Sequence, residues 1–323
     1  MKAIIYKKYG TPDVLNLQEV AKPTPKENEL LVKVHATTVT IADVRVRSFD
    51  VPTSVWLPAR LTLGLTKPKN QILGAELAGE VEAVGSGVTR FKPGDQIYAA
   101  TLPHFGGYAE YHCLQEDTAV SRKPNNLSYE EAAALPIGAR TALYYLRKAN
   151  IKKGHKILVY GASGSVGTYA VQLAKYFGAE VTGVCSTKNL ELVRSLGADH
   201  VIDYTRENFS ANGKRYDIIF EAVNKSSFSA CMKVLKQNGV YLNITNPLPT
   251  ISMLWTKITS KKNLVLGQDV PEVADYLDEI CKLVEAGFLK PIIDKQYPLE
   301  EIREAHRYTD TGHKKGNVVI SIA

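Results

Sequence analysis

The chain has 323 residues, of which 45% are hydrophobic and 23% charged, a globular composition long enough for two domains and without an apolar run that spans a bilayer. Its 40 basic and 33 acidic residues give a formal charge of +7, but the basic residues form only short runs without interleaved aromatics, so we expect a solvated surface and no nucleic-acid partner. The sequence has no signal-peptide pattern, and its four cysteines lack disulfide or metal-site spacing, which predicts free thiols and a cytoplasmic location.

Residues 1–125 are predicted to form a compact, mainly antiparallel β domain. The pattern consists of short strands cut by Gly and Pro. These strands lie within 2–20, at 29–36, at 74–85, after a turn in 91–98, and around 105–111. Residues 49–70 look irregular and contain prolines. Their apolar side chains could form a lid over a flat aromatic substrate, or the stretch could be an ordinary surface loop. The residues concerned are Phe49, Val51, Trp56, Leu57 and Leu61.

Residues 126–270 change to a regular alternation of helices and strands, which predicts a doubly wound parallel sheet. Ser128 and Glu131 form a capping box that opens a helix over 129–135, and a second helix covers 139–149. The elements that follow are expected at 157–160, 166–177, 180–185, 188–196, 199–203, 217–221, 226–236, 239–244 and 263–267. Residues 271–323 contain helix and end in a strand at 317–322, and we expect residues 290–323 to complete the first domain.

The most informative stretch joins a buried strand to a helix through three glycines. Gly161 permits the turn off the strand, Gly164 lets a pyrophosphate approach the backbone, and Gly167 lets helix and strand pack closely. The N–H groups at the start of the helix attract phosphates. The stretch therefore predicts a dinucleotide site that includes Ser163, Ser165 and Val166; the alternative is a glycine-rich turn in an ordinary α/β protein.

The choice of cofactor should be decided just after the second strand of this βαβ unit. Many NAD-binding folds place an acid there, against the ribose 2′-OH. Residues 184–189 contain no acid, and the Ser186 hydroxyl and the Lys188 cation suit a 2′-phosphate, which predicts NADPH in preference to NADH. The alternative is that Lys188 is only a solvated residue at a helix start.

Several motifs, in order along nearly the whole chain, resemble those of the medium-chain dehydrogenase/reductase superfamily and most of all its zinc-free quinone oxidoreductase branch. The motifs are GAELAG at 74–79, FKPGDQ at 91–96, GGYAE at 106–110, the glycine loop at 161–167, LGADHVIDY at 196–204 and HKKGNVVI at 313–320. The resemblance implies an α/β protein with a Rossmann doubly wound parallel sheet that binds NADP, plus a smaller GroES-like, mainly antiparallel catalytic domain. It also implies a homodimer.

The resemblance places further residues beside the cofactor. Tyr204 matches a tyrosine near the 2′-phosphate, and Thr141 would lie by the nicotinamide carboxamide. Four more positions have a structural role as their alternative: Asn224, Asn243 and Thr245, which would line the cofactor groove, and Asn317, which stands where relatives contact the cofactor.

The zinc-binding pattern of related alcohol dehydrogenases is not preserved. Those enzymes hold zinc with a Cys, the His of a Gly-His-Glu motif, and a further Cys or Asp. Here Thr40 and Ala75 replace the first two, Ile137 falls near the third, and only Glu76 survives. Because Ala and Ile cannot bind zinc, no metal is expected. Without a Lewis acid, we expect acceptors that take hydride unaided, such as quinones and conjugated enones.

No residue or motif in the sequence identifies the catalytic acid. Thr40 and Asp43 are the candidates for contact with the substrate, although Asp43 is equally suited to accept hydrogen bonds from Arg45 or Arg47. The sequence thus predicts a zinc-independent, NADPH-dependent oxidoreductase that passes hydride to a quinone or another enone. The alternatives are a zinc-free alkenal reductase, and an NADPH-loaded binding or structural protein that contacts RNA and turns over little.

Overall fold

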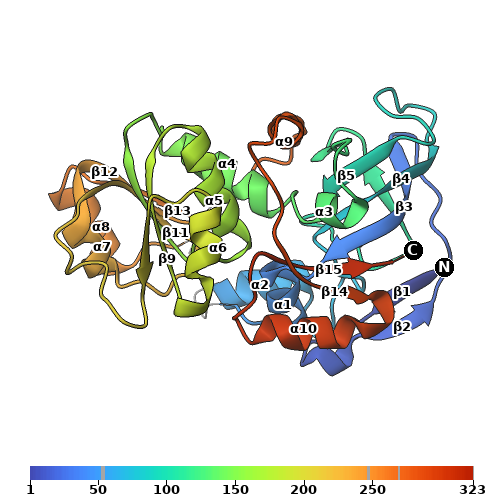
Figure 1. The fold of residues 1–323 in the computed structure, drawn as a ribbon. Coiled ribbons are helices and arrows are strands. Elements are labelled where there is room, and N and C mark those ends of the chain that lie inside the picture. The colour runs from blue at the N-terminus through green and yellow to red at the C-terminus, as the bar shows by residue number, and fades with distance from the viewer. Residues whose placement is uncertain (52–54, 246–247, 268–269, 323) are drawn as a thin grey trace. The chain divides into compact units, whose positions relative to one another are not determined.

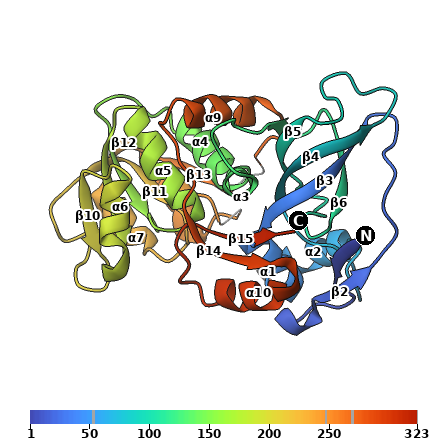
Figure 2. The ribbon, with the colours of Figure 1, turned by 45° about the vertical axis from the view of Figure 1, so that its right-hand side comes forward.

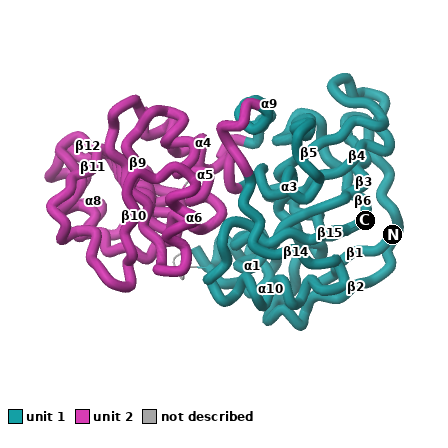
Figure 3. Tube along the Cα trace, in the orientation of Figure 1, with its two compact units in different colours: residues 1–137, 272–285, 291–323 teal, residues 138–271, 286–290 magenta. Residues whose placement is uncertain are grey.

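The computed structural model describes residues 1–51, 55–245, 248–267 and 270–322, and the chain forms two compact units. Unit 1 comprises Met1–Ile137, Glu272–Glu285 and Pro291–Ala323, and unit 2 comprises Gly138–Pro271 and Ala286–Lys290 (Figure 3). Residues 126–137, which we expected at the start of the second domain, therefore belong to unit 1.

Unit 1 is built on an antiparallel sheet. The strands of the unit are β1 (Lys2–Ile5), β2 (Asn16–Glu19), β3 (Glu29–Thr38), β4 (Glu76–Val84), β5 (Gln96–Ala100), β6 (Tyr111–Gln115), β7 (Val120–Arg122), β14 (Ile293–Pro298) and β15 (Asn317–Ser321). The main sheet has the order β14-β15-β3-β4-β5-β7, β6 also pairs with β3, and β1 pairs with β2 separately. All pairs are antiparallel except β14 with β15. This sheet confirms the predicted GroES-like architecture.

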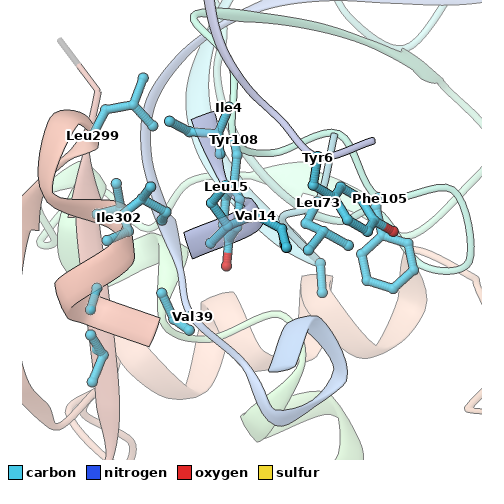
Figure 4. Close-up of a cluster of buried hydrophobic side chains, with 14 residues drawn as sticks. Ile4, Tyr6, Val14, Leu15, Val39, Leu73, Phe105, Tyr108, Leu299 and Ile302 are labelled. Atoms are coloured by element: carbon cyan, nitrogen blue, oxygen red, sulfur yellow. The ribbon is translucent and has the colours of Figure 1, made fainter. Parts of the chain in front are cut away.

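Helices α1 (Ile41–Ser48), α2 (Trp56–Leu63), α3 (Tyr129–Ala133), α9 (Asp275–Glu285) and α10 (Ile302–Asp310) complete unit 1. One hydrophobic cluster joins β1, the chain around Leu15, the segment before β4 and the start of α10 (Figure 4). It contains Ile4, Tyr6, Leu73 and Ile302, each almost fully buried. Burial of each such side chain stabilises the fold by about 1.5–3 kcal/mol, so the cluster fixes the N-terminal and C-terminal segments of unit 1 together.

Unit 2 is a doubly wound parallel sheet, as the sequence predicts. Its strands are β8 (Lys156–Tyr160), β9 (Glu180–Cys185), β10 (His200–Asp203), β11 (Tyr216–Glu221), β12 (Leu235–Asn243) and β13 (Asn263–Leu266), in the order β10-β9-β8-β11-β12-β13. Its helices are α4 (Gly138–Lys148), α5 (Ser165–Tyr176), α6 (Leu190–Ser195), α7 (Phe228–Val234) and α8 (Ile251–Thr259). Helices α5 and α6 cover one face and α7 and α8 the other (Figure 1). The winding direction reverses between β8 and β11, where such folds bind their ligands.

The prediction that residues 49–70 are irregular was wrong in part, because these residues contain α2. Residues 52–54 of this stretch lie outside the described residues. Pro58 misled the interpretation: it stands in the first turn of α2, where a missing N–H breaks no helical hydrogen bond.

Two other element predictions needed correction. The helix expected over 226–236 is α7, which ends at Val234, and Leu235 already begins β12. The stretch 105–111 enters strand β6 only at Tyr111, because Phe105 and Gly106 have φ angles of 57° and 112° and turn the chain. The sequence pattern also predicted no element at α1, α8, β7 or β14.

Candidate active site

The glycine loop follows β8 and leads into α5. Gly161 has a φ of +83°, a left-handed conformation that favours glycine. A Cβ on Gly167 would lie 2.1 Å from the carbonyl oxygen of Gly161, so helix and loop touch there. A Cβ on Gly164 would meet only that same oxygen, at 3.5 Å. The backbone at Gly164 is thus open, as the approach of a phosphate requires.

The first turn of α5 presents uncapped backbone N–H groups. Gly164 is its N-cap and has no side chain to accept them, and Ser165 and Val166 open the helix. Helix α4 begins beside this turn, since a Cβ on Gly138 would lie 2.6 Å from the Ser165 Oγ (Figure 2 shows the two helices adjacent). Thr141 lies on α4 one turn later and is partly exposed. The structure therefore brings Thr141 and the glycine loop to one region of unit 2.

Ser186, Lys188 and Tyr204 gather at the carboxyl ends of β9 and β10. Ser186 directly follows β9, Lys188 is exposed, and the Tyr204 backbone N–H donates to the Cys185 carbonyl at 3.1 Å. The acid in this region, Asp203, is buried and accepts hydrogen bonds from Thr187 and Thr205. Ser186, Lys188 and Tyr204 thus present a hydroxyl, a cation and a phenol here, and the exposed Arg206, 3.7 Å from Asp203, adds a second cation.

Asn189 is a residue of this region that the sequence analysis did not single out. Its side chain is 8% exposed, and its Nδ2 donates to the Ser163 Oγ at 2.9 Å and to the Ser186 Oγ at 3.4 Å. Its Oδ1 has no hydrogen-bond partner among the described residues. Asn189 therefore ties the glycine loop to the segment after β9. No local sequence pattern predicts this contact, because Ser163 is 26 residues away.

Glu221, also not singled out, organises the loop after β11. Its buried carboxylate accepts the backbone N–H groups of Val223 at 3.0 Å, Asn224 at 2.8 Å and Ser226 at 3.0 Å, and the Ser226 hydroxyl. These bonds hold Asn224 in a left-handed conformation with φ of 55°. An acid that directly follows a buried strand is the sequence signal for such a loop.

Asn224, Asn243 and Thr245 form one hydrogen-bonded chain at the carboxyl ends of β11 and β12. The Asn243 Nδ2 donates to the Asn224 Oδ1 at 2.9 Å, and the Asn243 Oδ1 accepts from the N–H and the hydroxyl of Thr245 at 3.1 and 3.0 Å. Asn243 is fully buried and is the middle residue of this hydrogen-bonded chain. Three predicted cofactor residues of unit 2 are thus neighbours.

In unit 1, Thr40 and Asp43 form the capping box that begins α1. The Asp43 Oδ2 accepts from the N–H and the hydroxyl of Thr40 at 2.9 and 2.6 Å, and its Oδ1 accepts from the Gly74 N–H at 2.8 Å. Asp43 is completely buried, and this burial raises its pKa to about 6. The proposed arginine partners were wrong, since Arg47 binds Asp310 instead.

Glu76 lies in the same unit and is also buried. The Thr38 hydroxyl and the Ile137 N–H, the latter at 2.6 Å, donate to its two oxygens. Burial raises the pKa of Glu76 to about 7, while the charge of Lys314 opposes this shift. Burial in turn lowers the pKa of Lys314 to about 8. Lys314 was not among the predicted residues.

Asn317 holds two chain segments of unit 1 together. Its backbone N–H and its Nδ2 donate to the Ile292 carbonyl at 2.8 and 3.1 Å. Its buried side chain therefore has a structural contact in addition to any role toward a cofactor.

The residues at the alcohol dehydrogenase zinc positions do not fit a zinc ion. The Thr40 hydroxyl donates to Asp43, and Ala75 and Ile137 have no donor atom in their side chains. Within the described ranges, no group of three or more His, Cys, Asp or Glu side chains is placed to hold a metal ion.

Comparisons with known proteins agree with this architecture. Residues 26–125 match the model of the alcohol dehydrogenase GroES-like domain, and residues 196–320 match that of a zinc-binding dehydrogenase, a stretch without Thr40, Ala75 or Ile137. The chloroplast envelope quinone oxidoreductase homolog of Arabidopsis thaliana is 37% identical over 99% of this chain and 98% of the relative. The chain belongs to the medium-chain dehydrogenase/reductase superfamily, in its quinone-oxidoreductase-like branch.

Other members of the branch give the same result. An NADPH-dependent alkenal/one oxidoreductase of Arabidopsis thaliana is 32% identical over 99% of this chain and 79% of the relative. The structure of Escherichia coli quinone oxidoreductase complexed with NADPH matches with a TM-score of 0.85 and 25% identity over 100% of both chains. The chain is thus a quinone-oxidoreductase-like enzyme, as predicted.

No helix in the part of the chain that the structure describes is long and apolar enough to cross a membrane. Both Arabidopsis relatives are named as chloroplast proteins, and the cytoplasmic location of this chain stays a prediction.

Proposed function

We propose that the chain is a zinc-independent oxidoreductase that uses NADPH to reduce quinones or other electrophilic enones. The observation that carries the proposal is the carboxyl edge of the unit 2 sheet. There the glycine loop leads into the uncapped N–H groups of α5, and Ser186, Lys188 and Tyr204 lie together. The acid at the end of β10, Asp203, is engaged by threonine hydroxyls. Positive and hydroxyl groups without a free acid favour a 2′-phosphate over a ribose 2′-OH.

Each group of residues would have its own role in binding the cofactor and the acceptor. The glycine loop and the start of α5 would hold the pyrophosphate, and Asn189 would keep Ser163 and Ser186 in place. Thr141 would lie by the nicotinamide carboxamide, and Asn224 and Thr245, held together by the buried Asn243, would line the cofactor groove. When bound, NADPH supplies the hydride, and with one proton from solvent or a side chain the quinone becomes a hydroquinone. We propose Thr40 as the group that contacts the acceptor and Asp43 as the residue that positions it, because Asp43 is buried and accepts the Thr40 hydroxyl.

The names of relatives support the acceptor class. One Arabidopsis relative is named for quinones and another for alkenals and alkenones. Both classes accept hydride without a metal to polarise them, which agrees with the unsuitable side chains at the zinc positions.

Loss of NADPH absorbance in the presence of simple quinones and enones tests the proposal, with a chelator added and NADH as the comparison. We expect NADPH-dependent turnover that is unchanged by the chelator. Tight NADPH binding without turnover on any acceptor would overturn the proposal and favour a cofactor-loaded binding protein.

We also propose that the protein is a homodimer. Strand β13 ends the order of the unit 2 sheet, so one of its edges offers backbone groups for pairing with a second copy. Sedimentation equilibrium tests the assembly, and a monomer at micromolar concentration would contradict it.

A further inference from the structure

Helix α2 exposes apolar side chains that contribute little to the core of unit 1. Trp56, Leu57 and Leu61 are 46%, 59% and 57% exposed, and Leu65, just after the helix, is 63% exposed. No residue of α2 is fully buried. A solvated helix face normally carries polar residues. An apolar face without a role in the core is a mark of a binding surface.

A cation–π cage, rather than core burial, fixes α2 to the rest of unit 1. The guanidinium carbon of Arg60 lies 3.7 Å from the ring centre of Phe49, 4.9 Å from that of Tyr9 and 5.3 Å from that of Trp56. The Arg60 Nη1 also donates to the Leu65 carbonyl at 3.2 Å. Trp56 belongs to α2 itself, so the contacts with Phe49 and Tyr9 join the helix to other segments, and each contributes about 0.5–2 kcal/mol.

The end of α2 is anchored by a second contact and lies beside a cavity. The Tyr9 hydroxyl donates to the Leu63 carbonyl at 2.9 Å. A cavity of about 590 Å³ opens next to it, lined by Leu61, Gly64, Leu65, Thr66, Lys67, Pro68, Lys69 and Gln71. Its volume is in the range of small-molecule sites.

Helix α1 connects this surface to the candidate catalytic residues. Thr40 and Asp43 lie at its start, and Phe49, a wall of the cage, is its C-cap (Figures 1 and 2 show α1 beside α2). Eight helical residues span about 12 Å. A ligand whose polar head lies at Thr40 therefore needs an extended chain of similar length to reach α2.

We propose that α2 and the adjoining cavity bind the hydrocarbon chain of an amphiphilic acceptor, a quinone or enone with a long alkyl or prenyl substituent. Arg60 is the positioning residue that holds this surface in place. The inference rests on the proposed reduction of quinones and enones. In this proposal the apolar face of α2 binds a substrate chain, and not a second copy of the protein or a bilayer.

Two quinones with the same head test the proposal, a dimethoxy-methyl-benzoquinone without a side chain and the same molecule with a decyl chain. We expect kcat/KM of the wild type to be at least tenfold higher for the decyl quinone, because each buried methylene can add about fourfold. The double substitution Leu57→Ser with Leu61→Ser should remove this preference and leave turnover of the unsubstituted quinone unchanged. Leu17→Ser with Leu254→Ser, at two exposed leucines outside α2, is the matched control.

The cage is tested by Arg60→Met, with Arg45→Met as control because Arg45 is exposed on α1. We expect Arg60→Met to raise KM for the decyl quinone several-fold and to leave kcat and the unsubstituted quinone unaffected. Equal effects on both quinones would show a general loss of structure and would contradict the positioning role.

A binding measurement separates this inference from the proposed function. The chain has two tryptophans, so Trp255→Phe leaves Trp56 as the only tryptophan fluorophore. We expect saturable quenching by the decyl quinone at concentrations where the unsubstituted quinone has no effect. Quenching without turnover of either quinone would support the chain site and reject the proposed function. Turnover of both quinones with no chain preference would overturn the inference, as would loss of an oligomer in the α2 serine variant.

Discussion

Gly164 precedes α5 and Gly167 lies in its first turn, and the two glycines are required for different reasons. A methyl group on Gly164 would make one ordinary contact, at 3.5 Å, whereas on Gly167 it would collide with the Gly161 carbonyl at 2.1 Å. We therefore expect Gly164→Ala to keep the thermal midpoint within a few degrees and to weaken NADPH binding at least tenfold. Gly167→Ala should lower the midpoint strongly, because backbone must move. Calorimetry and fluorescence titration of NADPH on both variants check this, and equal destabilisation would contradict it.

Lys188 is an exposed cation at the proposed 2′-phosphate position. Replacement by Ala should raise the Kd for NADPH about tenfold and leave that for NADH unchanged, because a charge-assisted hydrogen bond contributes about 1.5–3 kcal/mol. Titration of both cofactors measures the ratio. Lys214→Ala, at another exposed lysine of unit 2, is the control. A parallel change in both Kd values would show that Lys188 does not read the phosphate.

The sequence predicts those site residues whose role is local. The glycines from Gly161 to Gly167 act on neighbouring backbone, so their spacing between strand and helix was sufficient. Asn189 and Lys314 escaped prediction because the groups they interact with, Ser163 and Glu76, are far away in sequence. The same reason explains the error on Asp43: its remote partner is the Gly74 N–H, 31 residues on, and not a neighbouring arginine.

At the scale of elements, α1 is held to α10 by one buried arginine. The Arg47 side chain is 2% exposed; its Nη2 donates to both oxygens of Asp310 at 3.1 and 2.9 Å, and its Nη1 lies 3.0 Å from the His306 Nδ1. Burial, with the Arg47 charge as a smaller cause, keeps the pKa of His306 well below its usual range, so the ring is neutral and can accept this hydrogen bond.

Removal of this arginine should destabilise unit 1. We expect Arg47→Met to lower the free energy of unfolding by about 1.5–3 kcal/mol, because the bonds to the partly exposed Asp310 are broken and the buried His306 loses its donor. Urea denaturation measures the effect, with Arg45→Met as the exposed control on the same helix. A loss no larger than that of the control would mean that the pair adds nothing to stability.

Elements with strong periodicity or clear end signals were predictable, and isolated ones were not. The alternating β–α pattern of unit 2 and the capping box at Ser128 both appear in the structure. The Thr40–Asp43 capping box would have given α1 by the same rule. In contrast, α8 exposes Ile251, Trp255 and Ile258, so the face that usually marks a helix points to solvent. Strand β14 gains its place from pairing with β15, which no local pattern encodes.

At the scale of the whole molecule, pH should act on stability through the two buried carboxyl groups of unit 1. Burial raises the pKa of Asp43 from 3.8 to about 6 and that of Glu76 from 4.5 to about 7. As pH rises from about 4, the unfolded chain releases these protons first while the folded chain retains them. The folded state therefore holds more protons on these two groups in this window, so their contribution to stability is highest on its acidic side and falls until about pH 7. His112 and His306, whose pKa values burial lowers, contribute in the opposite direction.

Glu76→Gln isolates the contribution of one of these groups. The amide cannot ionise, so stability at pH 7 relative to that at about pH 4.5 should be higher in the variant than in the wild type by an amount on the order of 3 kcal/mol, while the part from Asp43 remains. Gln has an oxygen for one of the two donors, Thr38 and Ile137, so the variant should be less stable than the wild type at acidic pH and approach it near pH 7. Calorimetric midpoints in buffers across this range measure the difference. Parallel curves for wild type and variant would show that Glu76 does not titrate in this window.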